Sequence, residues 1–257
     1  KGGIQGHGDN PELMLGGFYM AYGLDRTATD IFTRLLDANR PQKTRDAAWL
    51  YLAKMRYLRN DYTGVTEALS RISDTPHLQL LNDKHALAIN VAIKQGELDQ
   101  AALLIADLNK QQDEYPYLNF NLASAYARSQ NYPTAIGFYK KLVNMPQRKN
   151  EHLTLYDKAM TAAGYAHLFN AEYDEAIQFF KRVRLESLMS GRALLGLGWA
   201  DFELKNYRSA LAPWQVLATS NIIDENTQNW ILDTFAWAIE NFDINDLIKD
   251  DDRREES

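Results

Sequence analysis

The sequence predicts an all-α protein, a superhelical solenoid built from antiparallel helix pairs. Three observations lead to this fold class. Apolar residues recur at three- and four-residue spacing along nearly the whole chain, which is the period of an amphipathic helix. Only seven prolines and fourteen glycines interrupt the 257 residues, and no long stretch alternates apolar with polar residues as a half-buried strand would. One short pattern also returns every 34 to 41 residues, which is typical of helical repeats.

The repeated pattern places a small residue on each of two successive helices. In the second helix of a pair, a large apolar residue follows the small one four positions later. The small residues of the second helices are Ala28, Val65, Ala101, Ala135, Ala176 and Ala210. The corresponding positions of the first helices hold Gly16, Ala53, Ile89, Ala123, Gly164 and Gly198. About six helix pairs are therefore predicted over residues 10–218, and five of the second-helix residues, from Val65 to Ala210, are expected to be nearly buried.

The first three pairs follow one another with little change. The segment "LGGFY…ATDIF" (15–32) contains the pattern of the first pair complete. In the second pair, Tyr62 follows an Asn-Asp that can cap a helix, and Val65 comes three residues later. The third pair keeps Ala101 and Ile105 in its second helix, but isoleucine replaces the small residue of its first helix.

The last three pairs are equally regular. The fourth is the segment "NFNLASAY…AIGFY" (119–139). The second helices of the fifth and sixth pairs begin at Tyr173 and Tyr207, each followed three residues later by alanine. Pro213 falls inside the second helix of the sixth pair, where it removes a backbone hydrogen bond and predicts a bend.

Two glycines of the sixth pair allow a second interpretation, a phosphate-binding turn. Such a turn needs a strand before Gly196 and a lysine or further glycines after Gly198, whereas the flanking residues continue a helix. We therefore expect the glycines to be packing positions, with Gly198 against Ala210. Tyr207 and Trp214 are then expected to fill the space toward the next pair.

Both ends of the chain are expected to lie outside the complete pairs. Residues 1–9 form a polar lead-in, residues 219–242 form one more helix of an incomplete pair, and residues 243–257 form an acidic tail or linker. Trp230 and Trp237 on that additional helix would be half exposed without a partner helix. This predicts that the chain is a piece of a longer polypeptide and that its C-terminal end can self-associate.

Composition excludes several classes of function. The chain has no cysteine, which rules out disulfides, zinc–thiolate sites and thiol nucleophiles. The net charge is −6, and residues 240–256 supply −5 of it, so the remainder is nearly neutral and lacks the basic surface of a nucleic-acid-binding protein. No apolar run approaches the roughly 18 residues that cross a bilayer. We expect neither nucleic acid as a partner nor insertion into a membrane.

The sequence contains no pattern of residues that predicts catalysis. The five histidines show no H-x-x-x-H or H-E-x-x-H spacing, and there is no G-x-S-x-G segment. We therefore predict no catalytic residue, no cofactor-binding residue and no metal ligand, and we do not expect an enzyme. His167 is predicted to be a packed imidazole that makes a hydrogen bond.

Binding of a protein or peptide is the remaining prediction. In stacked helix pairs the first helices line a concave face, and projecting the repeat places aromatic and cationic side chains there. The predicted binding residues are Lys54, Tyr57, Asn90, Lys94, Phe120, Arg128, Tyr165, Phe169, Arg192, Trp199 and Phe202. Large rings with a few long cations suit an extended peptide or a partner helix.

The repeat resembles the tetratricopeptide repeat, whose spacing is W-x₂-L-G-x₂-Y followed by A-x₃-F. The segments 15–32 and 119–139 match it best. Ile89 departs from the pattern, and Asp201 and His167 stand where tyrosine is usual. The resemblance implies a right-handed superhelix that binds protein segments.

Three longer segments resemble a group of exported tetratricopeptide proteins of Proteobacteria. They are residues 7–24, 45–62 and 193–217. The resemblance implies a periplasmic or envelope-associated, non-catalytic scaffold, and it carries over no catalytic residue. The alternatives are a regulatory arm of an envelope enzyme complex, such as a murein hydrolase or a system of polysaccharide synthesis or export, and a cytoplasmic regulator.

Overall fold

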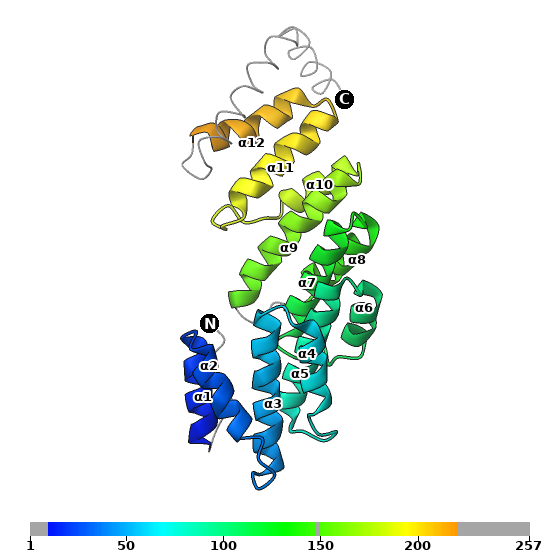
Figure 1. Cartoon of the computed structure of the whole chain (residues 1–257). Helices are drawn as coiled ribbons and strands as arrows, with labels where there is room; N and C mark the ends of the chain where they lie inside the picture. The colour runs from blue at the N-terminus through cyan, green and yellow to red at the C-terminus, as the bar shows by residue number, and fades with distance from the viewer. Residues whose placement is uncertain (1–9, 147–149, 220–257) are drawn as a thin grey trace. The chain divides into compact units, whose positions relative to one another are not determined.

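The structure is a computed structural model that describes residues 10–146 and 150–219, and within these ranges it consists of helices without any strand (Figure 1). The helices are α1 (Pro11–Ala21), α2 (Asp25–Arg34), α3 (Gln42–Leu58), α4 (Tyr62–Ser70), α5 (Leu78–Gln95), α6 (Leu98–Ala106), α7 (Tyr115–Arg128), α8 (Tyr132–Val143), α9 (Asn150–Phe169), α10 (Tyr173–Phe180), α11 (Ser190–Glu203) and α12 (Tyr207–Thr219). The predicted all-α class is confirmed.

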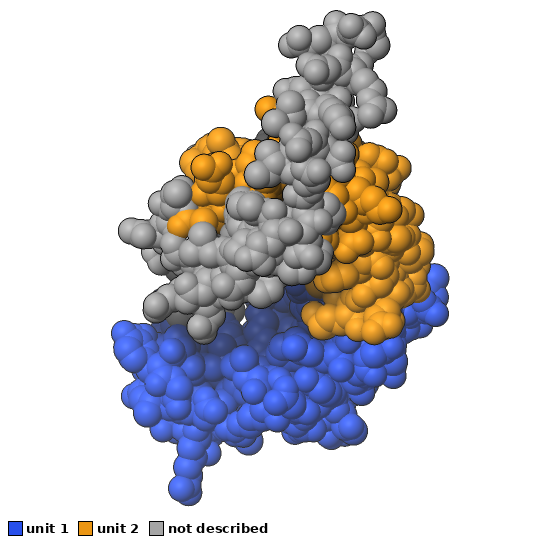
Figure 2. Space-filling model, turned by 90° about the horizontal axis from the view of Figure 1, so that it is seen from above, with its two compact units in different colours: residues 1–122 blue, residues 123–257 orange. Residues whose placement is uncertain are grey.

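The chain divides into two compact units, Lys1–Leu122 and Ala123–Ser257 (Figure 2). In the first unit the pairs α1/α2, α3/α4 and α5/α6 stack in chain order, each against the next. In the second unit α8 packs on α9, and the pairs α9/α10 and α11/α12 stack in the same way. The predicted helical repeat is therefore confirmed within each unit, while its handedness stays a prediction.

The turn inside each helix pair has the same backbone conformation in all six pairs. The residue two positions before the second helix takes a φ between 59° and 81°. These residues are Gly23, Asn60, Gly96, Gln130, Ala171 and Lys205. The next residue then donates its N–H to the carbonyl five residues earlier, as Asp61 does to Arg56 at 3.0 Å. This is the Schellman ending of a helix, and it gives every pair the same tight connection.

The two helices of a pair approach closely where the repeated small residues lie. The second-helix residues Ala28, Val65, Ala101, Ala135, Ala176 and Ala210 are at most 1% exposed, as predicted for the last five. In three pairs a large ring of the second helix packs directly on a glycine of the first. The rings of Phe32, Phe180 and Trp214 lie 2.6, 2.5 and 2.1 Å from where a Cβ would stand on Gly16, Gly164 and Gly198, respectively. A side chain at these glycines would displace the ring.

Trp214 corrects one detail of the sequence interpretation. Its ring packs on Gly198, and its Nε1 donates to the carbonyl of Leu195 at 3.2 Å. The ring therefore fills the interior of its own pair rather than the space toward the next pair. Pro213 lies inside α12, as predicted.

Polar side chains of three first helices hold the loops that follow the second helices, which the sequence did not predict, and two of them, Asp46 and Asp157, are buried. Each lies seven positions before the small residue of its first helix. Asp46 accepts from the N–H and Oγ of Ser73 at 3.0 and 2.6 Å, and Asp157 accepts from Nε and Nη2 of Arg184 at 3.0 and 2.6 Å. Asn82 accepts a similar bond from a loop glutamine at 2.8 Å. These bonds fix the start of the next pair.

Several predicted segments lie outside the described residues. They are the lead-in at 1–9 and, within 220–257, the additional helix with Trp230 and Trp237 and the acidic tail. In the part that is described, no helix has both the length and the hydropathy needed to span a membrane.

Candidate functional site

Three predicted binding residues of the first unit contact other residues of the same unit. Lys54 Nζ lies 2.7 Å from the carboxylate of Asp83. The side chain of Asn90 accepts a hydrogen bond from Asn121 at 3.2 Å and donates to a carbonyl of its own helix. Tyr57 is half-buried and packs on the hydrophobic core of this unit. Lys54, Tyr57 and Asn90 thus already have contacts within this unit.

Four further predicted residues lie scattered over the first helices. Lys94, Arg128 and Arg192 are exposed, and Phe120 is half-buried. None of the four lines a described cavity.

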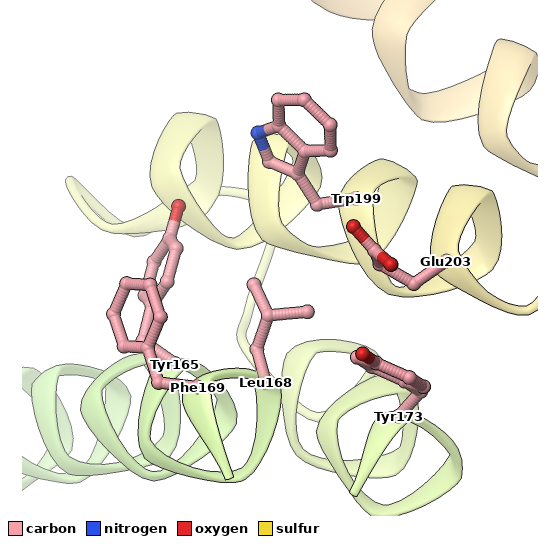
Figure 3. Close-up of a pocket in the computed structure, with 6 residues that line it drawn as sticks. All are labelled: Tyr165, Leu168, Phe169, Tyr173, Trp199 and Glu203. Atoms are coloured by element: carbon pink, nitrogen blue, oxygen red, sulfur yellow. The ribbon is translucent and has the colours of Figure 1, made fainter. Parts of the chain in front are cut away.

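In the second unit, three predicted residues come together around a cavity of about 330 Å³ (Figure 3). The cavity lies among α9, α10 and α11. Its lining consists of Tyr165, Leu168, Phe169, Tyr173, Trp199 and Glu203, hereafter the aromatic cavity. Its volume is at the lower end of the range for ligand pockets, so it has room for one or two side chains rather than for an extended ligand.

Tyr165 forms a fixed wall of the aromatic cavity. It extends from α9, and its hydroxyl donates to the backbone carbonyl of Arg192 on α11 at 2.8 Å. Its ring meets Phe180 edge-on at a centroid distance of 5.1 Å. Burial raises the pKa of the Tyr165 hydroxyl to about 12, and the positive charge of Arg192 only partly opposes that shift. Tyr165 is therefore neutral near pH 7 and ties the two first helices together.

Phe169 is the most exposed ring of the cavity, although two other rings lie beside it. Its centroid lies 6.1 Å from that of Tyr165 and 5.8 Å from that of Tyr132. Even so, 63% of the residue is exposed. An exposed ring with fixed neighbours loses little conformational entropy when a partner covers it.

Trp199 and Phe202 lie on α11 but have different surroundings. The Trp199 ring meets Trp214 edge-on at 5.5 Å and also lines the aromatic cavity. Phe202 packs between Trp214 and Tyr207, at 6.0 and 5.4 Å, and does not line the cavity. Of these two predicted residues, only Trp199 is placed to touch a partner there.

Sequence reasoning missed Leu168, Tyr173 and Glu203. Two of them carried a usable signal, because Tyr173 is the repeated first tyrosine of a second helix and Glu203 lies one turn after Trp199 on α11. The Glu203 carboxylate points from α11 toward the space beside Leu168 (Figure 3). Within residues 10–146 and 150–219, no hydrogen bond or ion pair satisfies this carboxylate.

His167 has the surroundings predicted for it. It is 1% exposed, its ring stacks on Phe179 at 5.0 Å, and its Nδ1 lies 2.5 Å from a carboxylate oxygen of Glu172. Burial lowers the pKa of His167, although the bond to Glu172 opposes the shift. In the ranges that the structure covers, no cluster of three or more His, Asp or Glu side chains could hold a metal ion.

A second apolar surface lies on α1 and the residue that follows it, distant in sequence from the aromatic cavity. It consists of Met14, Leu15, Phe18 and Tyr22, hereafter the α1 surface. Each of these side chains is 46–70% exposed. The α1 surface is therefore a competing site for any apolar partner.

Comparisons with known proteins agree with the repeat. A family model described as tetratricopeptide repeat matches residues 87–150. No curated protein matches the sequence. The crystal structure of RapI in its apo form is similar at 14% identity and a TM-score of 0.60, over 80% of this chain and 64% of RapI. BtubC (BKLC) from P. vanneervenii is similar at 15% identity and a TM-score of 0.53, over 90% of this chain and 89% of BtubC.

These similarities support the fold and a coarse function. This chain spans less than two thirds of the length of RapI, and identities this low bear on the fold alone. Tetratricopeptide repeats generally mediate binding to proteins or peptides and are generally non-catalytic. The chain therefore has a tetratricopeptide-type helical repeat, consistent with a protein partner.

Proposed function

We propose that this chain is a non-catalytic interaction scaffold that binds a peptide segment or helix of a partner protein at the aromatic cavity. One observation carries the proposal, namely that Phe169 is 63% exposed although two neighbouring rings hold it in place. Binding energy at protein interfaces concentrates in such aromatic anchors. Removing this exposed ring surface from water supplies a driving force without new charge pairs.

The finer proposal is that the scaffold acts in the bacterial cell envelope. It is supported by the resemblance of residues 7–24, 45–62 and 193–217 to exported tetratricopeptide proteins. The alternative is a regulatory arm of a murein hydrolase or of a system of polysaccharide synthesis or export, whose catalytic part lies outside this chain. The sequence that flanks the gene distinguishes these, because further repeats favour the scaffold and a catalytic domain favours the regulatory arm. A start codon directly before Lys1 without a signal sequence would instead favour a cytoplasmic regulator.

Selection from a random peptide library tests the binding proposal. The whole chain is immobilised, and the affinities of labelled synthetic copies of the selected peptides are measured by fluorescence anisotropy. We expect Phe169→Ala to weaken binding by about 30-fold or more, the loss typical of an interface hot spot. Phe169 is preferable to Tyr165 for this test, because Tyr165 also bonds to the backbone of α11.

Phe18→Ala is the matched control, since Phe18 is an exposed phenylalanine of the α1 surface. If Phe169→Ala weakens binding, Phe18→Ala leaves the affinity unchanged and both variants keep their thermal stability, the aromatic cavity is the binding site. If Phe18→Ala weakens binding and Phe169→Ala does not, the α1 surface is the binding site and the proposal is wrong.

A further inference from the structure

We infer that the aromatic cavity accepts the cationic side chain of an arginine or lysine in the bound partner segment. The inference rests on the proposed function, because it specifies which residue of a bound peptide enters the cavity. Charge complementarity is the main argument. Glu203 carries the one formal charge among the six lining residues, whose other members are aromatic or aliphatic.

The Glu203 carboxylate forms no ion pair or hydrogen bond with the described residues. Arg192 lies on the same helix, but it is eleven residues away, which is about 16 Å along the helix axis. That separation exceeds the Debye length of about 8 Å at physiological salt. Glu203 therefore places a carboxylate without an ion-pair partner among the described residues at one end of the cavity.

Three kinds of partner side chain can be compared for this cavity. An acidic side chain would meet the charge of Glu203 at close range and is disfavoured. An apolar side chain would cover the carboxylate and remove its water without supplying a hydrogen bond, which is costly. An arginine or lysine can place its methylene groups on Leu168 and Phe169 and its charge near Glu203. The apolar lining and the carboxylate then each have a suitable partner.

The aromatic rings add a second attraction for a cation. The face of a tryptophan, tyrosine or phenylalanine ring attracts a cation within about 6 Å of its centroid, and tryptophan does so best. The chain already contains such pairs, since Lys141 Nζ lies 4.7 Å from the Phe138 centroid and Lys54 Nζ lies 5.8 Å from that of Tyr51. In the cavity, Phe169 exposes its ring to a cation that comes from outside, and Trp199 lines the same space.

Neutral isosteres of the basic side chains test the inference directly. Peptides selected on the whole chain are resynthesised with citrulline for arginine, which removes the charge and keeps the shape, or with acetyl-lysine for lysine, which removes the charge and adds an acetyl group. We expect a basic residue to recur among the selected peptides. Its neutral isostere should weaken binding roughly fivefold to thirtyfold, the combined range for a cation near rings and a carboxylate.

Glu203→Gln completes a double-mutant cycle with the same peptides. It should weaken binding of the basic peptide by up to about fivefold, the range for an exposed ion pair, and leave the affinity of the isostere peptide unchanged. Glu186→Gln is the charge-matched control, because the Glu186 side chain is 74% exposed and does not line the cavity. This control should change neither affinity.

The outcomes separate the inference from the proposed function. If Phe169→Ala weakens binding but isosteres and Glu203→Gln do not, the inference is overturned and the binding proposal stands. If Glu203→Gln weakens binding of the basic peptide and of the isostere peptide equally, Glu203 does not interact with the basic side chain. The inference is then again overturned. If no peptide binds, or if Phe169→Ala weakens the binding of none of them, both the proposed function and the inference are wrong.

Discussion

The first-helix faces of the two units show how the same repeat can present different surfaces. In the first unit, Lys54 pairs with Asp83 and Asn90 bonds to Asn121, so the polar groups of this face largely satisfy one another. In the second unit, rings surround a cavity whose one carboxylate has no described partner. A repeat position therefore determines which way a side chain faces. Whether that side chain is available to a partner depends on its neighbours in the adjacent pairs.

The packing beneath the two faces is nearly the same. Phe32 fills the space above Gly16 in the first unit, and Phe180 fills the space above Gly164 in the second. All six turns share one backbone conformation. The surface side chains of the two faces thus differ, while the interior packing of the pairs is alike. Substitutions can therefore test surface binding and interior packing separately.

Removing the equivalent interior ring in each unit should give the largest effects. Phe32→Ala and Phe180→Ala should each lower the free energy of unfolding by about 3–5 kcal/mol, because a cavity remains where the ring packed on glycine. Phe180 also supports Tyr165, whose ring it meets edge-on. Urea unfolding followed by circular dichroism measures the loss of stability.

Peptide affinity distinguishes these two variants. Phe180→Ala should weaken binding at the aromatic cavity, whereas Phe32→Ala should leave it unchanged at temperatures where both variants are folded. Equal loss of affinity in both variants would show that the two faces do not act separately.

Enlarging a buried small residue should have the next largest effect. Ala176→Leu and Ala135→Leu should destabilise the protein by about 1–3 kcal/mol, because both alanines are fully buried and the added atoms must displace neighbours. Ala212→Leu on α12 is the control, since Ala212 is exposed and should change stability by less than about 0.5 kcal/mol. Similar unfolding midpoints for Ala176→Leu and Ala212→Leu would contradict the packing role of the repeated position.

The fold could be predicted from the sequence because its determinants recur. A small residue recurs every 34 to 41 positions in the six second helices, and five of the six first helices carry one at the matching position. The bonds that fix the loops could not be predicted in the same way, because Asp46, Asn82 and Asp157 have partners of different types. Their common place in the repeat becomes visible only when those partners are known.

The candidate site was only partly predictable. Periodicity identified Tyr165, Phe169 and Trp199, which do line one cavity. It could not show that Lys54 would be paired within the chain, since that contact joins different helix pairs. It placed Glu203 one turn after Trp199 on α11, but it could not show that this carboxylate lines the cavity.

Measuring stability as a function of pH compares the two units at one position of the repeat. This position lies three residues after the small residue of the first helix. The second unit has His167 there, and the first unit has Arg56, whose Nη1 donates to the carbonyl of Gly64 at 2.7 Å. Because burial holds the pKa of His167 below its ordinary value of 6.5, the unfolded chain takes up a proton before the folded protein does. Stability should therefore fall as the pH drops below about 6.5.

His167→Gln should flatten this pH dependence while keeping a donor for Glu172. The neighbouring charges of Lys140 and Glu175 remain in the variant, so any remaining slope reports on other groups. The bond from His167 lowers the pKa of Glu172, whose own contribution is lost only as the pH falls below about 4.5. An unchanged slope between pH 7 and pH 5 in His167→Gln would show that His167 does not cause it.

The ion pair of the first unit should give the smallest effect. Lys54→Gln, Asp83→Asn and the double variant form a cycle whose coupling free energy should be about 0.2–1 kcal/mol, because both side chains are partly exposed, at 36% and 26%. Asp83 also accepts from Gln79 at 3.1 Å, so the cycle is needed to separate the pair from that second bond. Affinity for the selected peptides should not change in any of the three variants, since Lys54 does not line the aromatic cavity. A coupling free energy of zero together with weaker peptide binding in Lys54→Gln would mean that the lysine serves the partner rather than Asp83, and the first unit would then join the binding surface.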